Sequence, residues 1–215
     1  MIASWPCPGG DEQAHTFDRG RAKRLLILPA WFDEANKLRH FTVQTMRLLD
    51  AMGADSFLPD LPGCNESLAP LSAQTLSGWK DAAAAAASHF RASHVLAIRA
   101  GVLLAPDLPG WRYAPASGPQ LLRAMIRARL LASKEASRSE SREELMAEGR
   151  GNGLILLGYP LGPEMLRGLE TADLPDMPHL QLIAPSDLGG PGLWLRAEPG
   201  HDQTQAHALA AILAA

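Results

Sequence analysis

Short apolar runs alternate with longer segments of helical periodicity along most of the chain, and this alternation constrains the fold more than any other feature. The runs are too short for helices and lack a polar face, which is typical of strands buried on both sides. A helical segment follows most of them, which favours parallel strands joined by right-handed crossovers. The sequence therefore predicts an α/β protein with a mostly parallel, doubly wound sheet, and its 215 residues predict a single domain over 1–215.

The predicted strands are the apolar runs, and the predicted helices are the segments between them. The expected strands are 25–31, 54–59, 94–98, 109–114, 154–159, 180–185 and 193–197. The expected helices are 36–52, 72–91, 118–134, 164–170 and 203–215. Residues 1–20 are rich in glycine, proline and charge, so they predict an irregular start or an edge strand.

Residues 133–153 differ from the rest because they are charged and carry few apolar side chains. They predict a partly helical, mobile excursion that is the remnant of a cap or a dimer-contact arm, with Ser141 and Glu144 as a capping box.

Composition excludes several classes of function. A net charge of −3 and a pI of about 6.2 argue against nucleic acid as the main partner. No apolar run approaches the roughly 20 residues of a membrane span, and residues 1–20 do not read as a signal peptide. Cys7 and Cys64 lack metal-ligand spacing and suggest no disulfide framework. We therefore expect a cytoplasmic protein without a metal or cofactor.

The end of the predicted strand 94–98 carries the most informative motif. Residues 97–101 read Ala-Ile-Arg-Ala-Gly, a strand running into a tight turn. A nucleophile elbow has the pattern Gly-x-Ser-x-Gly and presents its serine on a strained turn. Here Arg99 stands where that serine would be, with Ala97 and Gly101 at the flanking positions. A guanidinium stays protonated at physiological pH and cannot attack a carbonyl, so the scaffold lacks its reacting group.

Five segments in order together carry a family resemblance. They are 28–39 (LPAWFDEANKLR), 58–67 (LPDLPGCNES), the helix with Trp79 and Asp81, 97–101 and 157–164 (LGYPLGPE). The chain resembles, over roughly residues 24–210, the exosortase-A-associated hydrolases of the second type, a branch of the α/β-hydrolase superfamily. This resemblance implies an α/β-hydrolase-like fold with a reduced cap, arginine at the elbow as a family feature, and a link to bacterial exopolysaccharide export and protein sorting.

The chain also departs from that family's pattern. Ala97 replaces the elbow glycine, and Cys64 and Asn65 replace a Gly-Asp pair in the second segment. Residues 199–203 lack an expected aromatic pair. These departures weaken the case for hydrolytic chemistry, and fold alone does not fix function.

Catalytic candidates are placed by chain order, which in this fold runs nucleophile, acid, histidine. His201 lies between the last predicted strand and the last helix, and Asp187 follows the strand 180–185. The alternatives are a surface histidine beside a helix cap and a turn aspartate. Cys64 could replace the missing nucleophile only if a cation such as Arg39 or Arg99 lowered its pKa; loop packing is the alternative.

Binding candidates cluster at the carboxyl ends of the predicted strands, where ligands bind in such sheets. They are Glu34, Asn36, Arg39, Asp60 and Arg99. In the structural alternative, Asp33 or Glu34 caps the helix 36–52 and Arg39 pairs with a carboxylate. A buried Arg99 needs a carboxylate, and we expect Glu34 before Asp33 or Asp60, a pair that would seal the site.

Three functions remain open at this point. The first is a non-catalytic binding or accessory protein, the second an active ester or acyl hydrolase with a non-standard nucleophile, and the third a small-anion binder that uses Arg99. A small-molecule or acyl ligand and a second copy of the chain are the partners to consider. The basic stretch 123–129 predicts a solvated helix face, with an anionic partner as its alternative.

Overall fold

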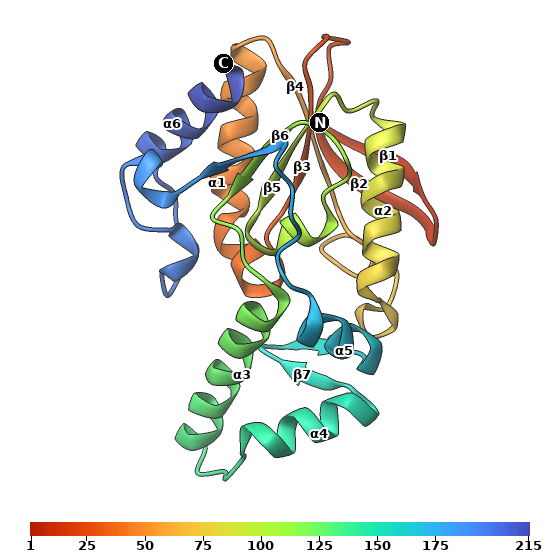
Figure 1. Ribbon diagram of the computed structural model, residues 1–215, viewed down its shortest axis with the longest axis vertical. Coiled ribbons are helices and arrows are strands. Elements are labelled where there is room, and N and C mark those ends of the chain that lie inside the picture. Colours follow the sequence, from red (N-terminus) through yellow and green to blue (C-terminus); the bar gives the residue numbers. More distant parts are fainter.

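A seven-stranded sheet with helices on both faces forms the centre of the protein (Figure 1). The computed structural model describes residues 1–215. The strand order is β1-β2-β4-β3-β5-β6-β9. The strands are β1 (Ile2–Cys7), β2 (Gly10–Phe17), β3 (Arg24–Leu28), β4 (Asp55–Pro59), β5 (His94–Ile98), β6 (Gly110–Tyr113) and β9 (Leu180–Ile183). The last five are parallel, and β1 and β2 are antiparallel, which confirms the predicted mostly parallel α/β sheet.

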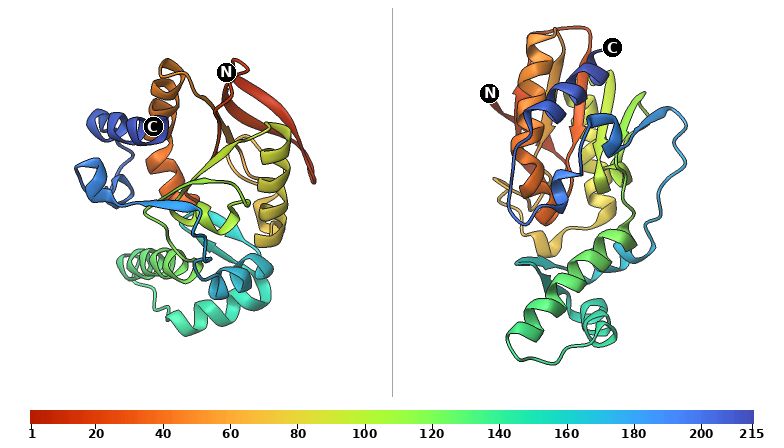
Figure 2. Two further views of the ribbon diagram at one scale, coloured as in Figure 1. Left: turned by 45° about the horizontal axis from the view of Figure 1, so that its top comes forward. Right: turned by 90° about the vertical axis from the view of Figure 1, so that its left-hand side faces the viewer.

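Six helices accompany the sheet. They are α1 (Phe32–Ala51), α2 (Leu76–His89), α3 (Gly118–Glu135), α4 (Arg142–Asn152), α5 (Pro163–Thr171) and α6 (Gln203–Ala214). Helices α1 and α6 lie together on one face and α2 lies on the other, while α3, α4 and α5 extend beyond the sheet (Figures 1 and 2). None of the helices combines the length and apolarity needed to cross a membrane.

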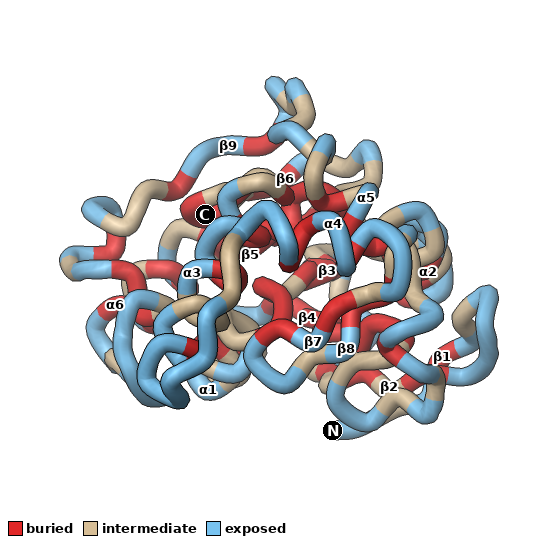
Figure 3. The backbone as a smooth tube through the Cα atoms, turned by 90° about the horizontal axis from the view of Figure 1, so that it is seen from below, coloured by how far each residue is buried: buried red, intermediate tan, exposed pale blue.

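Two hydrophobic cores lie on the two faces of the sheet, because successive side chains of a strand point to opposite sides. In β3, Leu25 and Ile27 pack with α1 and α6, whereas Leu26 and Leu28 pack with α2. All four are buried, as are the central strands generally (Figure 3). Burial on both faces explains why β3 reads as a continuous apolar run.

Residues 1–20 are more ordered than the irregular start that we predicted. They form the hairpin β1–β2, which joins the sheet through β4, so the edge-strand alternative describes β1. Trp5 holds this hairpin against the core, because its side chain is 1% exposed and its ring lies 6.2 Å from the ring of Phe90. One large aromatic side chain anchors a segment that composition alone would class as a loop.

Two further predicted strands lie outside the sheet. The run 154–159 divides into β7 (Leu154–Leu156) and β8 (Tyr159–Leu161), which pair only with each other. The run 193–197 is not a strand, since Leu193–Leu195 forms a 3₁₀ helix. Its neighbour Gly192 lies under the indole of Trp194, and a Cβ there would be 2.3 Å from the ring. Short apolar runs do not reveal such turns, because periodicity needs more residues.

The excursion at 133–153 is helical over α4, and the predicted capping box at Ser141 and Glu144 is present. Leu145 and Met146 are buried, and they anchor α4 more firmly than the charge density led us to expect. The mobility of this segment stays a prediction, which we now restrict to the exposed turn 136–139.

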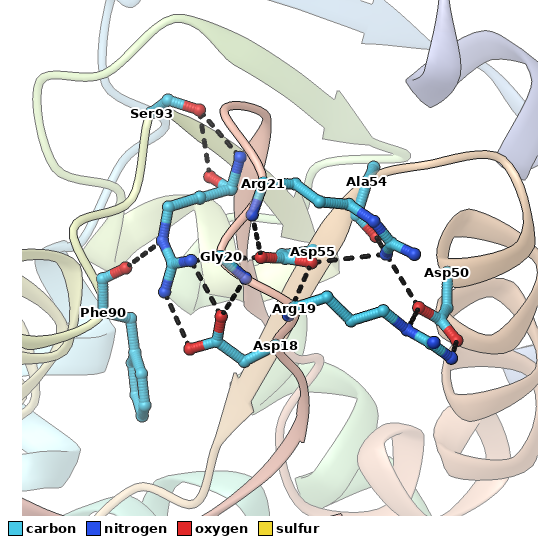
Figure 4. Close-up of polar contacts among 10 residues, drawn as sticks. Asp18, Arg19, Gly20, Arg21, Asp50, Ala54, Asp55, Phe90 and Ser93 are labelled. Carbon is cyan, nitrogen blue, oxygen red and sulfur yellow. Dashed lines mark hydrogen bonds and ion pairs between the residues drawn. The ribbon is translucent and has the colours of Figure 1, made fainter.

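An ionic network ties the β2–β3 connection to the amino ends of the parallel strands (Figure 4). Asp55 is fully buried at the start of β4 and accepts hydrogen bonds from the backbone N–H groups of Arg19 (3.0 Å) and Arg21 (2.8 Å). Arg24 bridges Asp55 at 3.1 Å and Asp18 at 2.9 Å. The network lies at the opposite end of the parallel strands from the turn at Arg99, so it stabilises the scaffold and leaves the site free.

Candidate functional site

The turn after β5 has the geometry of a nucleophile elbow. Arg99 has φ of 54°, a left-handed conformation that is uncommon for a bulky residue and costs about 1–3 kcal/mol. A Cβ at Gly101 would lie 2.5 Å from the carbonyl oxygen of Leu28, so only glycine fits there. The fold therefore presents the Arg99 side chain where an elbow presents its nucleophile.

Arg99 is held by three groups from three different segments. Its Nε and Nη2 donate to the two carboxylate oxygens of Glu34, each at 3.0 Å, and its Nη1 donates to the carbonyl of Ala114 at 2.6 Å. The indole of Trp194 covers the guanidinium, with 4.2 Å between its ring centroid and Cζ. The predicted pair with Glu34 is confirmed, and Asp33 and Asp60 pair elsewhere.

The Arg99–Glu34 pair is mostly buried, and it occupies the position in front of the elbow. The side chains of Arg99 and Glu34 are 17% and 15% exposed. A bidentate arginine–carboxylate pair satisfies both charges in a fixed geometry. The space in front of the elbow is thus taken by a neutralised ion pair.

Glu34 reaches this position from the first turn of α1, where the positive end of the helix dipole interacts favourably with acidic side chains. The helix begins after Trp31, which makes no side-chain cap, so the expectation that Asp33 or Glu34 caps it is wrong. Asp33 pairs with Lys37 at 2.7 Å, a spacing of one helical turn. Asn36 is exposed.

The other two binding candidates, Arg39 and Asp60, form a second ion pair. Asp60 is 3% exposed and accepts from Nη1 of Arg39 at 3.1 Å and from the amide of Asn65 at 2.6 Å. Desolvation, and after it the charges of Asp60 and Glu12, raise the pKa of Cys64 to about 12. A thiol with such a pKa is inert at neutral pH, which argues against Cys64 as a nucleophile.

The two catalytic candidates are not joined by a hydrogen bond. Asp187 accepts from the backbone N–H of Ala184 at 2.8 Å, which is the turn role that was its alternative. His201 is exposed and stacks on His40, with ring centroids 4.5 Å apart. The prediction placed His201 directly after a strand at 193–197. This segment is a turn, so His201 does not follow the end of a sheet strand.

Sequence reasoning missed Trp194 and Tyr113. Trp194 lies in the turn that we predicted as a strand, so nothing in its spacing pointed to Arg99. Burial raises the pKa of Tyr113 to about 12, and its hydroxyl has no hydrogen-bond partner. Its ring lies 5.7 Å from that of Trp194, so it packs against the indole that covers the guanidinium. No cluster of three or more His, Cys, Asp or Glu side chains is arranged to hold a metal ion.

Comparison with known proteins establishes the fold. No family profile matches the sequence, and no curated protein is a significant match. Among solved structures, the chain is similar to alpha/beta hydrolase domain-containing protein 10 from mouse, with 13% identity, a TM-score of 0.57, and coverage of 99% of this chain and 96% of that one. It is also similar to a "Putative hydrolase" from Agrobacterium vitis S4, with 15% identity, a TM-score of 0.51, and coverage of 99% and 98%. The chain therefore has the α/β-hydrolase fold.

Proposed function

We propose that this protein is a non-catalytic member of the α/β-hydrolase fold that serves as a binding or accessory protein. The observation that carries the proposal is Arg99, which occupies the nucleophile position of the elbow and is neutralised there by Glu34. Hydrolysis by this fold needs a group that attacks the carbonyl, and a protonated guanidinium cannot do so.

No nearby side chain supports the alternative of an unusual nucleophile. Cys64 is kept protonated by its raised pKa. The Oγ of Ser117 accepts from the backbone N–H of Gln120 at 3.3 Å, as the N-cap of α3. Both residues have structural roles that explain their presence.

Small-anion binding by Arg99 is also disfavoured by its contacts. Glu34 already supplies the negative charge, and Trp194 covers the face of the guanidinium. An anion would have to displace a bidentate carboxylate, which is a strong form of ion pair.

The biological setting is a further part of the proposal and depends on the resemblance of five segments to the exosortase-A-associated hydrolases. We infer a cytoplasmic accessory role in exopolysaccharide export or protein sorting. A strain that lacks the gene should then export less polymer, and the His201→Ala variant should restore export fully. Failure of that variant alone to complement would show that hydrolysis is required.

The direct test is an activity screen. Wild-type protein should hydrolyse neither short p-nitrophenyl esters nor a broad set of esters and thioesters faster than buffer does. The His201→Ala variant, whose altered side chain is exposed, is the matched control. Turnover by the wild type that disappears in the variant would demonstrate a functional triad and refute the proposal.

A further inference from the structure

A small, partly open cavity lies beside the elbow and is separate from the Arg99–Glu34 pair. It has a volume of about 100 Å³ and lies between the start of α1, the 60–67 loop and the β7–β8 hairpin. Neither Arg99 nor Glu34 lines it. Sealing the elbow therefore leaves this cavity intact, and a binding protein of this fold retains a place for a ligand.

Most of the cavity wall is apolar. Aromatic rings form one side, because Phe32 lies between Trp31 and Tyr159, with centroid distances of 6.4 Å and 5.3 Å. Leu58 and Leu71 contribute aliphatic surface. An apolar cavity of about 150 Å³ accommodates benzene, so a cavity of about 100 Å³ accommodates an apolar group of about four carbon atoms.

The polar lining contains donors that the protein does not use. Arg39 lines the cavity, its side chain is 38% exposed, and only its Nη1 is engaged, with Asp60. The Nε and Nη2 groups of Arg39 and the side chain of Asn36 make no hydrogen bond within the protein. An apolar pocket with a few convergent polar groups is the usual form of a small-molecule site. These donors are partly exposed to water, and a ligand with an acceptor oxygen can take the place of that water.

The charges around the cavity favour an uncharged ligand. The carboxylate of Asp60 already neutralises Arg39. The carboxylates of Asp60 and Glu12 add to the effect of burial in raising the pKa of Cys64, which lines the same cavity. An anionic ligand would be repelled by the carboxylates of Asp60 and Glu12, whereas a carbonyl oxygen would accept a hydrogen bond without adding charge.

We propose that this cavity binds an uncharged molecule with an apolar part of about four carbon atoms and one carbonyl oxygen, such as a short amide, lactone or ester, and that Arg39 donates to that oxygen. The proposal rests on the proposed function in one respect, namely that a bound ester or lactone is retained and not hydrolysed.

The test is titration with butyramide and with butyrate, its charged counterpart of the same size, followed by ligand-observed NMR and by the Nε–H resonance of Arg39. We expect saturable butyramide binding that shifts this resonance, and at least tenfold weaker binding of butyrate. Ala35→Leu fills the cavity and should weaken butyramide binding at least tenfold. Ala51→Leu, at an exposed position of the same helix, should leave it unchanged. Cys64→Met is a second filling variant if Ala35→Leu does not fold.

Three results would overturn the proposal: no saturable binding of butyramide, equal affinity in the filled and unfilled cavities, or butyrate binding as tightly as butyramide. Turnover of γ-butyrolactone would instead contradict the proposed function while leaving the binding site in place. The two proposals thus fail by different observations.

Discussion

Replacing Arg99 by alanine tests the closed elbow most directly. The substitution removes two hydrogen bonds to Glu34, one to Ala114 and the contact with Trp194. It leaves the Glu34 carboxylate, with 15% of its side chain exposed, without its partner. Alanine keeps the positive φ of the turn, so backbone strain changes little, and the measured effect reports the lost contacts.

The expected loss of stability follows from this burial. Breaking a fully buried ion pair costs about 3–5 kcal/mol, because one charge stays behind without compensation. Here both side chains retain some exposure, and water reaches the abandoned carboxylate. We therefore expect Arg99→Ala to lower the free energy of unfolding by about 2–3 kcal/mol. For a chain of this length, that corresponds to a decrease in Tm of roughly 4–12 °C.

The assay is urea unfolding of Arg99→Ala, Glu34→Gln and the double variant. Because the two side chains act as a pair, the double variant should be less destabilised than the sum of the single variants, with a coupling energy of about 1.5–3 kcal/mol. Arg123→Ala is the matched control, since Arg123 is exposed and forms no ion pair, and its effect should stay within about 0.5 kcal/mol.

Two outcomes would refute this reasoning. The first is a loss from Arg99→Ala no larger than that from Arg123→Ala. The second is strict additivity of the two substitutions, which would mean that Arg99 and Glu34 do not interact in solution.

Four further outcomes are expected. Arg99→Ser alone should not restore ester hydrolysis, because Asp187 and His201 share no hydrogen bond; a burst of product with a trapped acyl-enzyme would contradict this. Hydrogen bonds from Arg19 and Arg21 hold the pKa of Asp50 at about 2, below its unfolded value, so urea unfolding should show stability lost as the pH falls from about 4 to 2. The loss should be smaller in Asp50→Asn but still present, because the pKa values of Asp18, Glu140 and Glu170 are also lowered in the folded protein; an equal loss in the variant would contradict this. The raised pKa of Cys64 should make its alkylation at pH 8 far slower than that of a free thiol, as mass spectrometry can measure; rapid labelling of native protein would show an accessible thiolate. Hydrogen exchange should be fast at 136–139 and slow in α4, and protection that appears at 136–139 only at high concentration would indicate a dimer contact.

Much of the sheet could be predicted, because its central strands are buried on both faces and are therefore continuous apolar runs in the sequence. The runs that became β3, β4, β5, β6 and β9 were placed within a few residues of their observed bounds. Of the hairpin β1–β2, the sequence indicated only a possible edge strand, because the position of the hairpin depends on the burial of Trp5, a single aromatic residue in an otherwise polar segment. The pair β7–β8 was read as one strand because a single short apolar run does not show its internal turn at Leu157 and Gly158.

The candidate site could be predicted only in part. The motif at 97–101 identified the elbow, and the need to pair a buried cation pointed to Glu34. The turn role of Asp187 is a local contact and was one of the alternatives considered. The pairing of Arg39 with Asp60 and the indole over Arg99, in contrast, depend on contacts between segments distant in sequence. No local pattern encodes such contacts.

The sequence by itself determined the class of fold, the position of the elbow and the absence of serine from it. These features are local, since burial on two faces, turn geometry and the chemistry of a side chain are properties of short segments. The tertiary structure decided which carboxylate neutralises Arg99, where His201 lies, and that a cavity remains beside the closed elbow. Those outcomes depend on how loops from β3, β4 and β9 pack against one another, and packing is a property of the whole chain.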